Sequence, residues 1–63
     1  MSKALRDRFS LAKIQKKLKM LGYEPGEIDG YFGGKTSAAI AAYQKDNYLE
    51  VTGKPTVELQ RML

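Results

Sequence analysis

Apolar residues recur at helical spacing in the first third of the chain. Leu11, Ile14, Leu18 and Leu21 follow one another every three or four positions, and lysines fill the positions between them. This spacing predicts an amphipathic helix. Gly22 comes next, and glycine is typical just past a helix end because it adopts the left-handed conformation at little cost. The pattern therefore predicts a first helix that ends at about residue 21.

The start of this helix has two interpretations. Leu5, Phe9 and Ala12 lie along a neighbouring stripe of the same helix, which favours a start well before Ser10. Ser10 is also a suitable N-cap, because its hydroxyl can accept a backbone N–H at a helix start. Residues 1–10 are thus either a helical extension or an N-terminal arm, and residues 11–63 form the domain.

A second helix is predicted over residues 35–47, "KTSAAIAAYQKDN", because this segment is rich in alanine and has high helix propensity. Ala39, Ile40, Tyr43 and Gln44 share one face of that helix, and the small alanines allow a neighbouring helix to approach closely. We expect Tyr43 to be buried.

The third helix is predicted to start at Thr56. The Thr56 hydroxyl can cap it, Pro55 precedes it, and Glu58 in its first turn complements the helix dipole. Its apolar surface consists of Val57, Leu59, Met62 and Leu63.

Residues 22–34, "GYEPGEIDGYFGG", hold five glycines and one proline. Pro25-Gly26 predicts a type II turn, and Asp29-Gly30 predicts a second turn in which the Asp29 carboxylate accepts backbone N–H bonds. The fold class predicted is therefore all-α: a small three-helix bundle with an ordered Gly-rich loop between its first two helices. The expected core is Ile14, Leu18, Leu21, Ile28, Phe32, Ile40, Leu49, Val51, Leu59 and Leu63.

Composition limits the chemistry. The 63 residues include no cysteine and no histidine, which excludes disulfides, the usual zinc sites and triads built on imidazole or thiol. Membrane insertion is not expected, because no apolar run approaches the ~20 residues of a membrane helix. The first ten residues lack the apolar region of a signal peptide.

The positive charge is concentrated at the N-terminal end. The net charge is +4, and seven of the eleven basic residues lie in the first nineteen positions, against the single acid Asp7. An anionic partner would explain this asymmetry, but a solvated helix face explains it more simply. The linker of about a dozen residues after the first helix is too long for a helix-turn-helix, so we expect no specific nucleic-acid binding.

The spacing of the residues argues against two kinds of site, a phosphate-binding loop and a calcium loop. "GYFGGKT" at residues 30–36 resembles a phosphate-binding loop, but that motif needs glycine at the position of Asp29. Glu24, Glu27 and Asp29 do not follow the spacing of a calcium loop, and a few acids in a loop are a weak catalytic signal. We therefore expect no catalytic residue, no metal, no cofactor and no enzyme activity.

Several motifs in register carry a family resemblance. The run "IQKKLKMLGYEPGEIDGYFGGKTSAAIAAYQKDNYLEVTG" closely resembles the type 1, three-helix peptidoglycan-binding domain, and the resemblance covers about residues 11–63. The matching residues are Ile14-Gln15, Leu18, Leu21-Gly22-Tyr23, Gly26, Ile28-Asp29-Gly30, Phe32-Gly33, Thr36, Ala39-Ile40, Tyr43-Gln44, Leu49 and Val51-Thr52-Gly53.

The resemblance implies a non-catalytic, monomeric module in the bacterial cell envelope, outside the cytoplasm and part of a larger protein. Such a module binds peptidoglycan through its glycan or its stem peptides, and targets or anchors a protein that acts on the cell wall. A module of the same fold that binds another protein is the alternative, and a basic helical domain that binds nucleic acid is a less favoured one.

Binding residues should be exposed aromatic and hydrogen-bonding groups that flank the loop or close the second helix. The expected set is Tyr23, Tyr31, Lys35, Asn47 and Tyr48. Gln15, Asp29 and Gln44 are instead expected to satisfy backbone groups of the loop and the helix ends.

Overall fold

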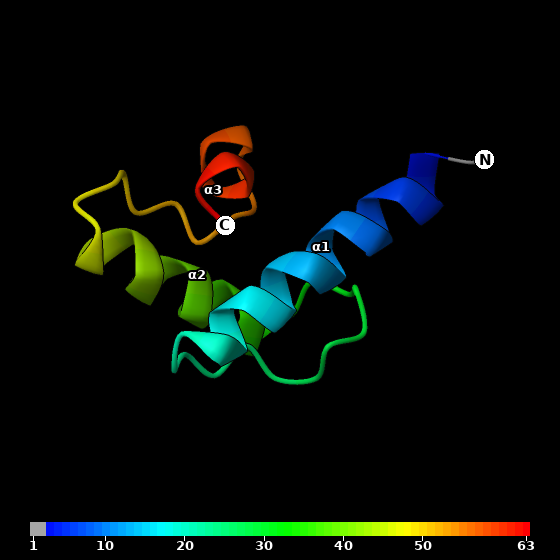
Figure 1. The fold of residues 1–63 in the computed structure, drawn as a ribbon, viewed down its shortest axis with the longest axis horizontal. Helices are drawn as coiled ribbons and strands as arrows, with labels where there is room; N and C mark the ends of the chain where they lie inside the picture. Colours follow the sequence, from blue (N-terminus) through cyan, green and yellow to red (C-terminus); the bar gives the residue numbers. More distant parts are fainter. Residues whose placement is uncertain (1–2) are drawn as a thin grey trace.

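The computed structural model describes the backbone of residues 3–63 and the side chains of residues 10–63. It contains three helices, α1 (Lys3–Met20), α2 (Gly34–Asp46) and α3 (Val57–Met62), and no strand over the described backbone. In Figure 1, α1 and α2 cross each other and the short α3 lies over one side of the pair. The predicted all-α, three-helix architecture is confirmed.

Helix α1 is the longer of the two alternatives considered from the sequence. It begins at Lys3 and passes through Ser10 without a break. Its first turns project beyond the other two helices in Figure 1. The side chains of residues 1–9, including the basic Lys3, Arg6 and Arg8, lie outside the described part of the structure.

The end of α1 is closed by a glycine in the left-handed conformation. Gly22 has φ 97°, and its N–H donates to the Lys19 carbonyl at 3.1 Å. The Tyr23 N–H donates to the Leu18 carbonyl at 2.9 Å. This pair of bonds is a Schellman motif, which satisfies carbonyls that the helix leaves without partners. It confirms the helix end predicted from Gly22.

The end of α2 has the same motif with a tyrosine in place of the glycine. Tyr48 has φ 59°, and its N–H donates to the Lys45 carbonyl at 3.3 Å. The Leu49 N–H donates to the Gln44 carbonyl at 2.8 Å. A left-handed conformation costs an L-residue roughly 1–2 kcal/mol, so this tyrosine strains the backbone.

The Thr56 cap of α3 is as predicted, because its hydroxyl accepts the Leu59 N–H at 3.2 Å.

The core lies where the three helices meet. It consists of Leu11, Ile14, Leu18, Ala39, Ile40, Tyr43 and Leu59. Leu18, Ile40 and Leu59 are fully buried, and the predicted burial of Tyr43 is confirmed. Leu49 and Leu63 were expected in the core but are only partly buried against it.

Four residues expected in the core are instead exposed. Leu21, Ile28, Phe32 and Val51 have 44–56% of their surface accessible. Leu21 lies just beyond the last turn of α1, where the chain turns away from the core. The other three lie in loops, and the reason for their exposure is that polar side chains from the helices hold the loop backbone.

Gln15 of α1 holds the first loop. It is 1% exposed, and its Oε1 accepts the backbone N–H groups of Asp29 at 3.2 Å and Gly30 at 2.9 Å. Its Nε2 donates to the Tyr31 carbonyl at 3.0 Å and to Thr36 Oγ1 at 2.9 Å. The inside of this loop is thus occupied by the Gln15 carboxamide, which is hydrogen-bonded to the loop backbone. The side chains of Ile28 and Phe32 lie outside it.

Gln44 of α2 holds the second loop in the same way. Its Oε1 accepts the N–H groups of Thr52 at 2.9 Å and Gly53 at 3.0 Å, and its Nε2 donates to Thr52 Oγ1 at 3.0 Å. The bonds draw the backbone at residues 52 and 53 inward, and Val51 points outward. We call these two arrangements the Gln15 and Gln44 clamps. They confirm the structural roles predicted for both glutamines.

Asp29 also has its predicted role. Its Oδ1 accepts the Tyr31 N–H at 2.9 Å, which forms the turn expected at Asp29-Gly30, and Gly30 has φ 78°. Gly26, at φ 86°, has the conformation that the type II turn requires of its third residue.

Candidate functional site

A groove opens where the C-terminal ends of α1 and α2 meet α3. We call it the tyrosine groove, and its volume is about 470 Å³. Both helices end there in Schellman motifs, so the chain turns away and leaves the helix ends uncovered. The groove is lined by Lys17, Met20, Leu21, Tyr23, Tyr43, Asn47, Met62 and Leu63. It combines two aromatic rings, an apolar wall and a cation.

Tyr23 is fixed in this groove by two contacts. Its hydroxyl donates to Asp46 Oδ2 at 2.6 Å, and its ring meets the Tyr43 ring edge-on, with centroids 5.9 Å apart and an interplanar angle of 82°. Edge-to-face rings attract each other because the positive edge of one meets the negative face of the other. A partly exposed ring with little freedom of movement is a suitable contact for a ligand.

The bond to Asp46 changes the acidity of Tyr23. The hydrogen bond to the carboxylate raises the pKa of the Tyr23 phenol above its usual value, with smaller contributions from burial and from the Asp46 charge. Folding therefore favours the protonated phenol. Its contribution to stability is fully present below the ordinary tyrosine pKa of ~10, and it is lost as pH rises through the higher folded-state pKa.

We predict that Asp46→Asn will lower the pKa of Tyr23 toward its usual value, because an amide oxygen is a weaker hydrogen-bond acceptor than a carboxylate and carries no charge. Site-resolved NMR titration of the Tyr23 ring measures this shift. Asp29→Asn serves as a control that removes a distant carboxylate. Equal Tyr23 pKa values in the wild type and in Asp46→Asn would contradict the proposed cause.

Asn47 lines the tyrosine groove with Tyr23, and Tyr48 follows Asn47 at the end of α2 without lining the groove. The Asn47 carboxamide donates to the Tyr43 carbonyl at 2.8 Å, so this predicted ligand residue also caps its helix. Tyr48 is 97% exposed. The structure therefore places three of the five predicted site residues at one end of α2.

Tyr31 and Lys35 lie at the other end of α2, in a shallow hollow of about 270 Å³ under the glycine-rich loop. The stem of Lys35 packs over Gly26, where an added Cβ would be 3.3 Å from the Lys35 Cβ. Glu27 and Asp29 line the same hollow, and their carboxylates offset the attraction of Lys35 for an anion.

The two groups cannot contact one small ligand together. Helix α2 has 13 residues, which places its ends about 20 Å apart at 1.5 Å per residue. The predicted residues thus form two separate areas, with Tyr23, Asn47 and Tyr48 in one and Tyr31 and Lys35 in the other.

The other residues that line the tyrosine groove were not predicted from the sequence as site residues. Lys17 was interpreted as part of a solvated face, and Leu63 as core. Lys17 stands at the border of the apolar and polar sides of α1, and such border positions line a groove when a neighbouring helix is short. The border position of Lys17 can be recognised as part of a groove only once α3 is known to have six residues.

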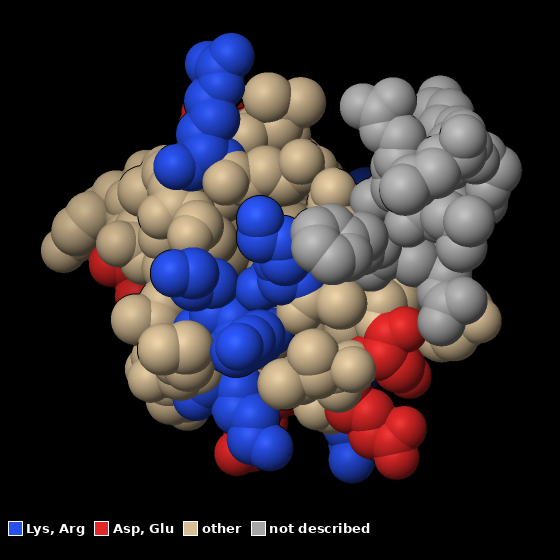
Figure 2. All heavy atoms as spheres, turned by 45° about the vertical axis from the view of Figure 1, so that its right-hand side comes forward, with Lys and Arg blue, Asp and Glu red and all other residues tan. Residues whose placement is uncertain are grey.

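Lysine and arginine side chains gather over the middle of the face shown in Figure 2, and acidic side chains lie toward its edges. The exposed basic residues of α1 in the described part are Lys13, Lys16, Lys17 and Lys19.

Among the side chains described, no group of three potential ligands could hold a metal ion. Within the described helices, none has the length and apolar character needed to cross a membrane.

Comparison with known proteins supports this description. No curated protein and no solved structure gives a significant match to the chain. A family model described as "Putative peptidoglycan binding domain" matches residues 10–63, which is most of the sequence. The fold, the motifs in register and this match agree, and the chain belongs to that peptidoglycan-binding domain family.

Proposed function

We propose that this chain is a non-catalytic module that binds peptidoglycan and holds a protein that acts on the cell wall against its substrate. Family membership supports peptidoglycan as the ligand. We propose Tyr23, Asn47 and Tyr48 as one contact area, and Tyr31 and Lys35 as a second. The module would then work in the cell envelope, outside the cytoplasm.

The observation that carries this proposal is the conformation and exposure of Tyr48. Its ring is 97% exposed and contributes almost nothing to the core, yet its backbone occupies the left-handed position that suits glycine. Backbone strain without a folding benefit is common at functional sites. An exposed aromatic face beside a groove is suited to stacking against the C–H groups of a sugar ring.

Two weak areas about 20 Å apart suit a polymer better than a small molecule. Peptidoglycan repeats the same chemical groups along each strand, so one strand could contact both ends of α2. Contacts that are weak individually then combine, because the second forms at high effective concentration once the first is made.

Substitution of Tyr48 separates binding from stability. We expect Tyr48→Gly to raise the free energy of unfolding by about 0.5–1 kcal/mol, because relief of the left-handed strain exceeds the entropy cost of glycine. Tyr48→Ala should keep most of the strain and leave stability nearly unchanged. Both variants lose the ring and should bind purified sacculi about fivefold more weakly, which corresponds to ~1 kcal/mol of aromatic contact.

Co-sedimentation with sacculi measures the binding, and chemical denaturation measures the stability. Val57→Ala, which changes an exposed apolar residue on α3, is the control for non-specific loss. If the wild type stays in the supernatant with sacculi from several cell-wall types, the peptidoglycan proposal is wrong. If both Tyr48 variants bind as strongly as the wild type, Tyr48 is not part of the site, but peptidoglycan remains the proposed ligand.

A further inference from the structure

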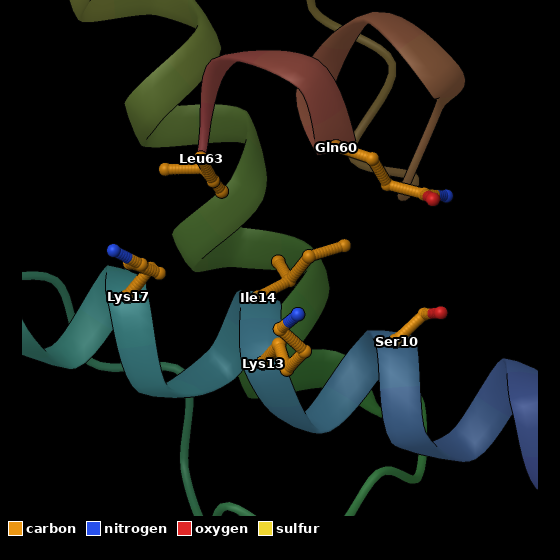
Figure 3. A pocket seen from close by; sticks show the side chains of 6 residues that line it. All are labelled: Ser10, Lys13, Ile14, Lys17, Gln60 and Leu63. Carbon is orange, nitrogen blue, oxygen red and sulfur yellow. The ribbon is translucent and has the colours of Figure 1, made fainter.

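A second groove of about 470 Å³ runs between α1 and α3, on the other side of Lys17 and Leu63 from the tyrosine groove. We call it the α1–α3 groove. Figure 3 shows the side chains around it: four come from α1, Gln60 comes from α3, and Leu63 directly follows α3. They are Ser10, Lys13, Ile14, Lys17, Gln60 and Leu63. None of them belongs to the set proposed above for binding.

The lining of this groove differs in kind from that of the tyrosine groove. No aromatic ring is among its described lining residues, so these residues offer no face on which a sugar could stack. Ile14 and Leu63 instead provide the apolar part of its lining. Ser10 and Gln60 add a hydroxyl and a carboxamide on the two facing helices, and such groups form hydrogen bonds with peptide bonds.

The groove also carries two cations on one wall. Lys13 and Lys17 are four residues apart on α1, which places them one turn or about 6 Å apart along the axis. Both line the groove and lie on either side of Ile14 in the sequence. Each ammonium group offers three donors, and bonds from an ammonium to a carboxylate are stronger than neutral ones. The wall therefore favours a ligand with a free carboxylate.

We propose that the α1–α3 groove takes the peptide part of peptidoglycan, with a free carboxylate of the stem peptide at Lys17 and Lys13 and its peptide bonds at Ser10 and Gln60. The inference rests on the proposed function, and it divides the ligand between two neighbouring grooves. Sugar contacts fall to the tyrosine groove and peptide contacts to the α1–α3 groove. Lys17 and Leu63 line both grooves, so a peptide attached to a bound glycan can pass directly from one to the other.

The chain offers a closely matched pair of variants for the test. Lys17→Met and Lys16→Met each remove one exposed lysine from the same helix, but only Lys17 lines the grooves. Two soluble probes are titrated into each protein: disaccharide-peptide muropeptides, and glycan strands from which the peptides have been cleaved. Affinities and amide chemical shifts are recorded, and thermal unfolding confirms that both variants are folded.

We expect muropeptides, and not peptide-free glycan, to shift the amides of Ser10, Ile14 and Gln60. Lys17→Met should weaken muropeptide binding about tenfold, the loss expected for a charge-assisted bond, and Lys16→Met less than twofold. Muropeptides whose carboxylates are converted to amides should bind wild type at least as weakly as normal muropeptides bind Lys17→Met, because amidation removes the partner of both lysines.

The outcomes separate this inference from the proposed function. Equal weakening by the two lysine variants would indicate diffuse charge attraction and overturn the peptide assignment, as would muropeptide shifts confined to the tyrosine groove. Both results leave peptidoglycan binding in place. Absence of binding to sacculi and to both probes would overturn the proposed function itself, and the peptide assignment with it.

Discussion

Replacing Gln15 by leucine is expected to destabilise the protein by about 2–4 kcal/mol, although leucine has a similar volume and is more hydrophobic. The substitution leaves the N–H groups of Asp29 and Gly30 without their acceptor, and a buried donor without a partner costs about 1–3 kcal/mol. Domains of this size rarely have more than ~3–5 kcal/mol of stability, so much of the protein should unfold near room temperature.

Urea denaturation followed by circular dichroism measures this effect. Lys16→Leu, at the next and exposed position of α1, is the control and should change stability by less than about 0.5 kcal/mol. Gln44→Leu removes the second clamp and should have a loss of similar size. A Gln15→Leu protein as stable as the wild type would show that the loop is held by other contacts.

Leu59→Ala is the second substitution with a large expected effect. Leu59 is fully buried and is the one described residue of α3 in the core cluster, so its truncation removes the attachment of a six-residue helix. Truncation of a buried leucine costs about 2–5 kcal/mol. For a domain of this size we expect the melting temperature to fall by more than about 10 °C.

The consequence extends to binding, because α3 supplies Gln60 and Met62 to the grooves. At a temperature where Leu59→Ala is still mostly folded, α3 should detach and muropeptide affinity should fall. Val57→Ala in the same helix changes an exposed residue and should leave both properties nearly unchanged. Retained affinity in a Leu59→Ala protein with detached α3 would place the ligand away from α3.

The helices could be predicted from the sequence because their signals are local. The spacing of Leu11, Ile14 and Leu18, the left-handed glycine at residue 22 and the Thr56 cap depend on near neighbours in the chain. Burial in the loops could not be predicted in this way. Ile28 and Phe32 are apolar, but their exposure results from hydrogen bonds that Gln15 makes with backbone 14 or more positions away.

Residue types for a candidate site could be chosen from the sequence, but the places of these residues in the fold could not. Tyr23, Asn47 and Tyr48 lie together at one end of α2, while Tyr31 and Lys35 lie at the other. Their separation depends on where each helix begins and ends in space, which residue identity does not give. Lys17 was missed because an exposed lysine on a basic helix looks the same in a sequence whether or not it borders a groove.

The two clamps have a consequence for how this surface can change. Apart from the bond of Gln44 to Thr52 Oγ1, the groups that Gln15 and Gln44 bind in the loops belong to the backbone, and every residue except proline can supply them in full. The outward-facing positions 28, 31, 32 and 51 can therefore accept new side chains with little effect on folding. A scaffold of this kind lets ligand preference diversify through surface substitutions while the architecture stays the same.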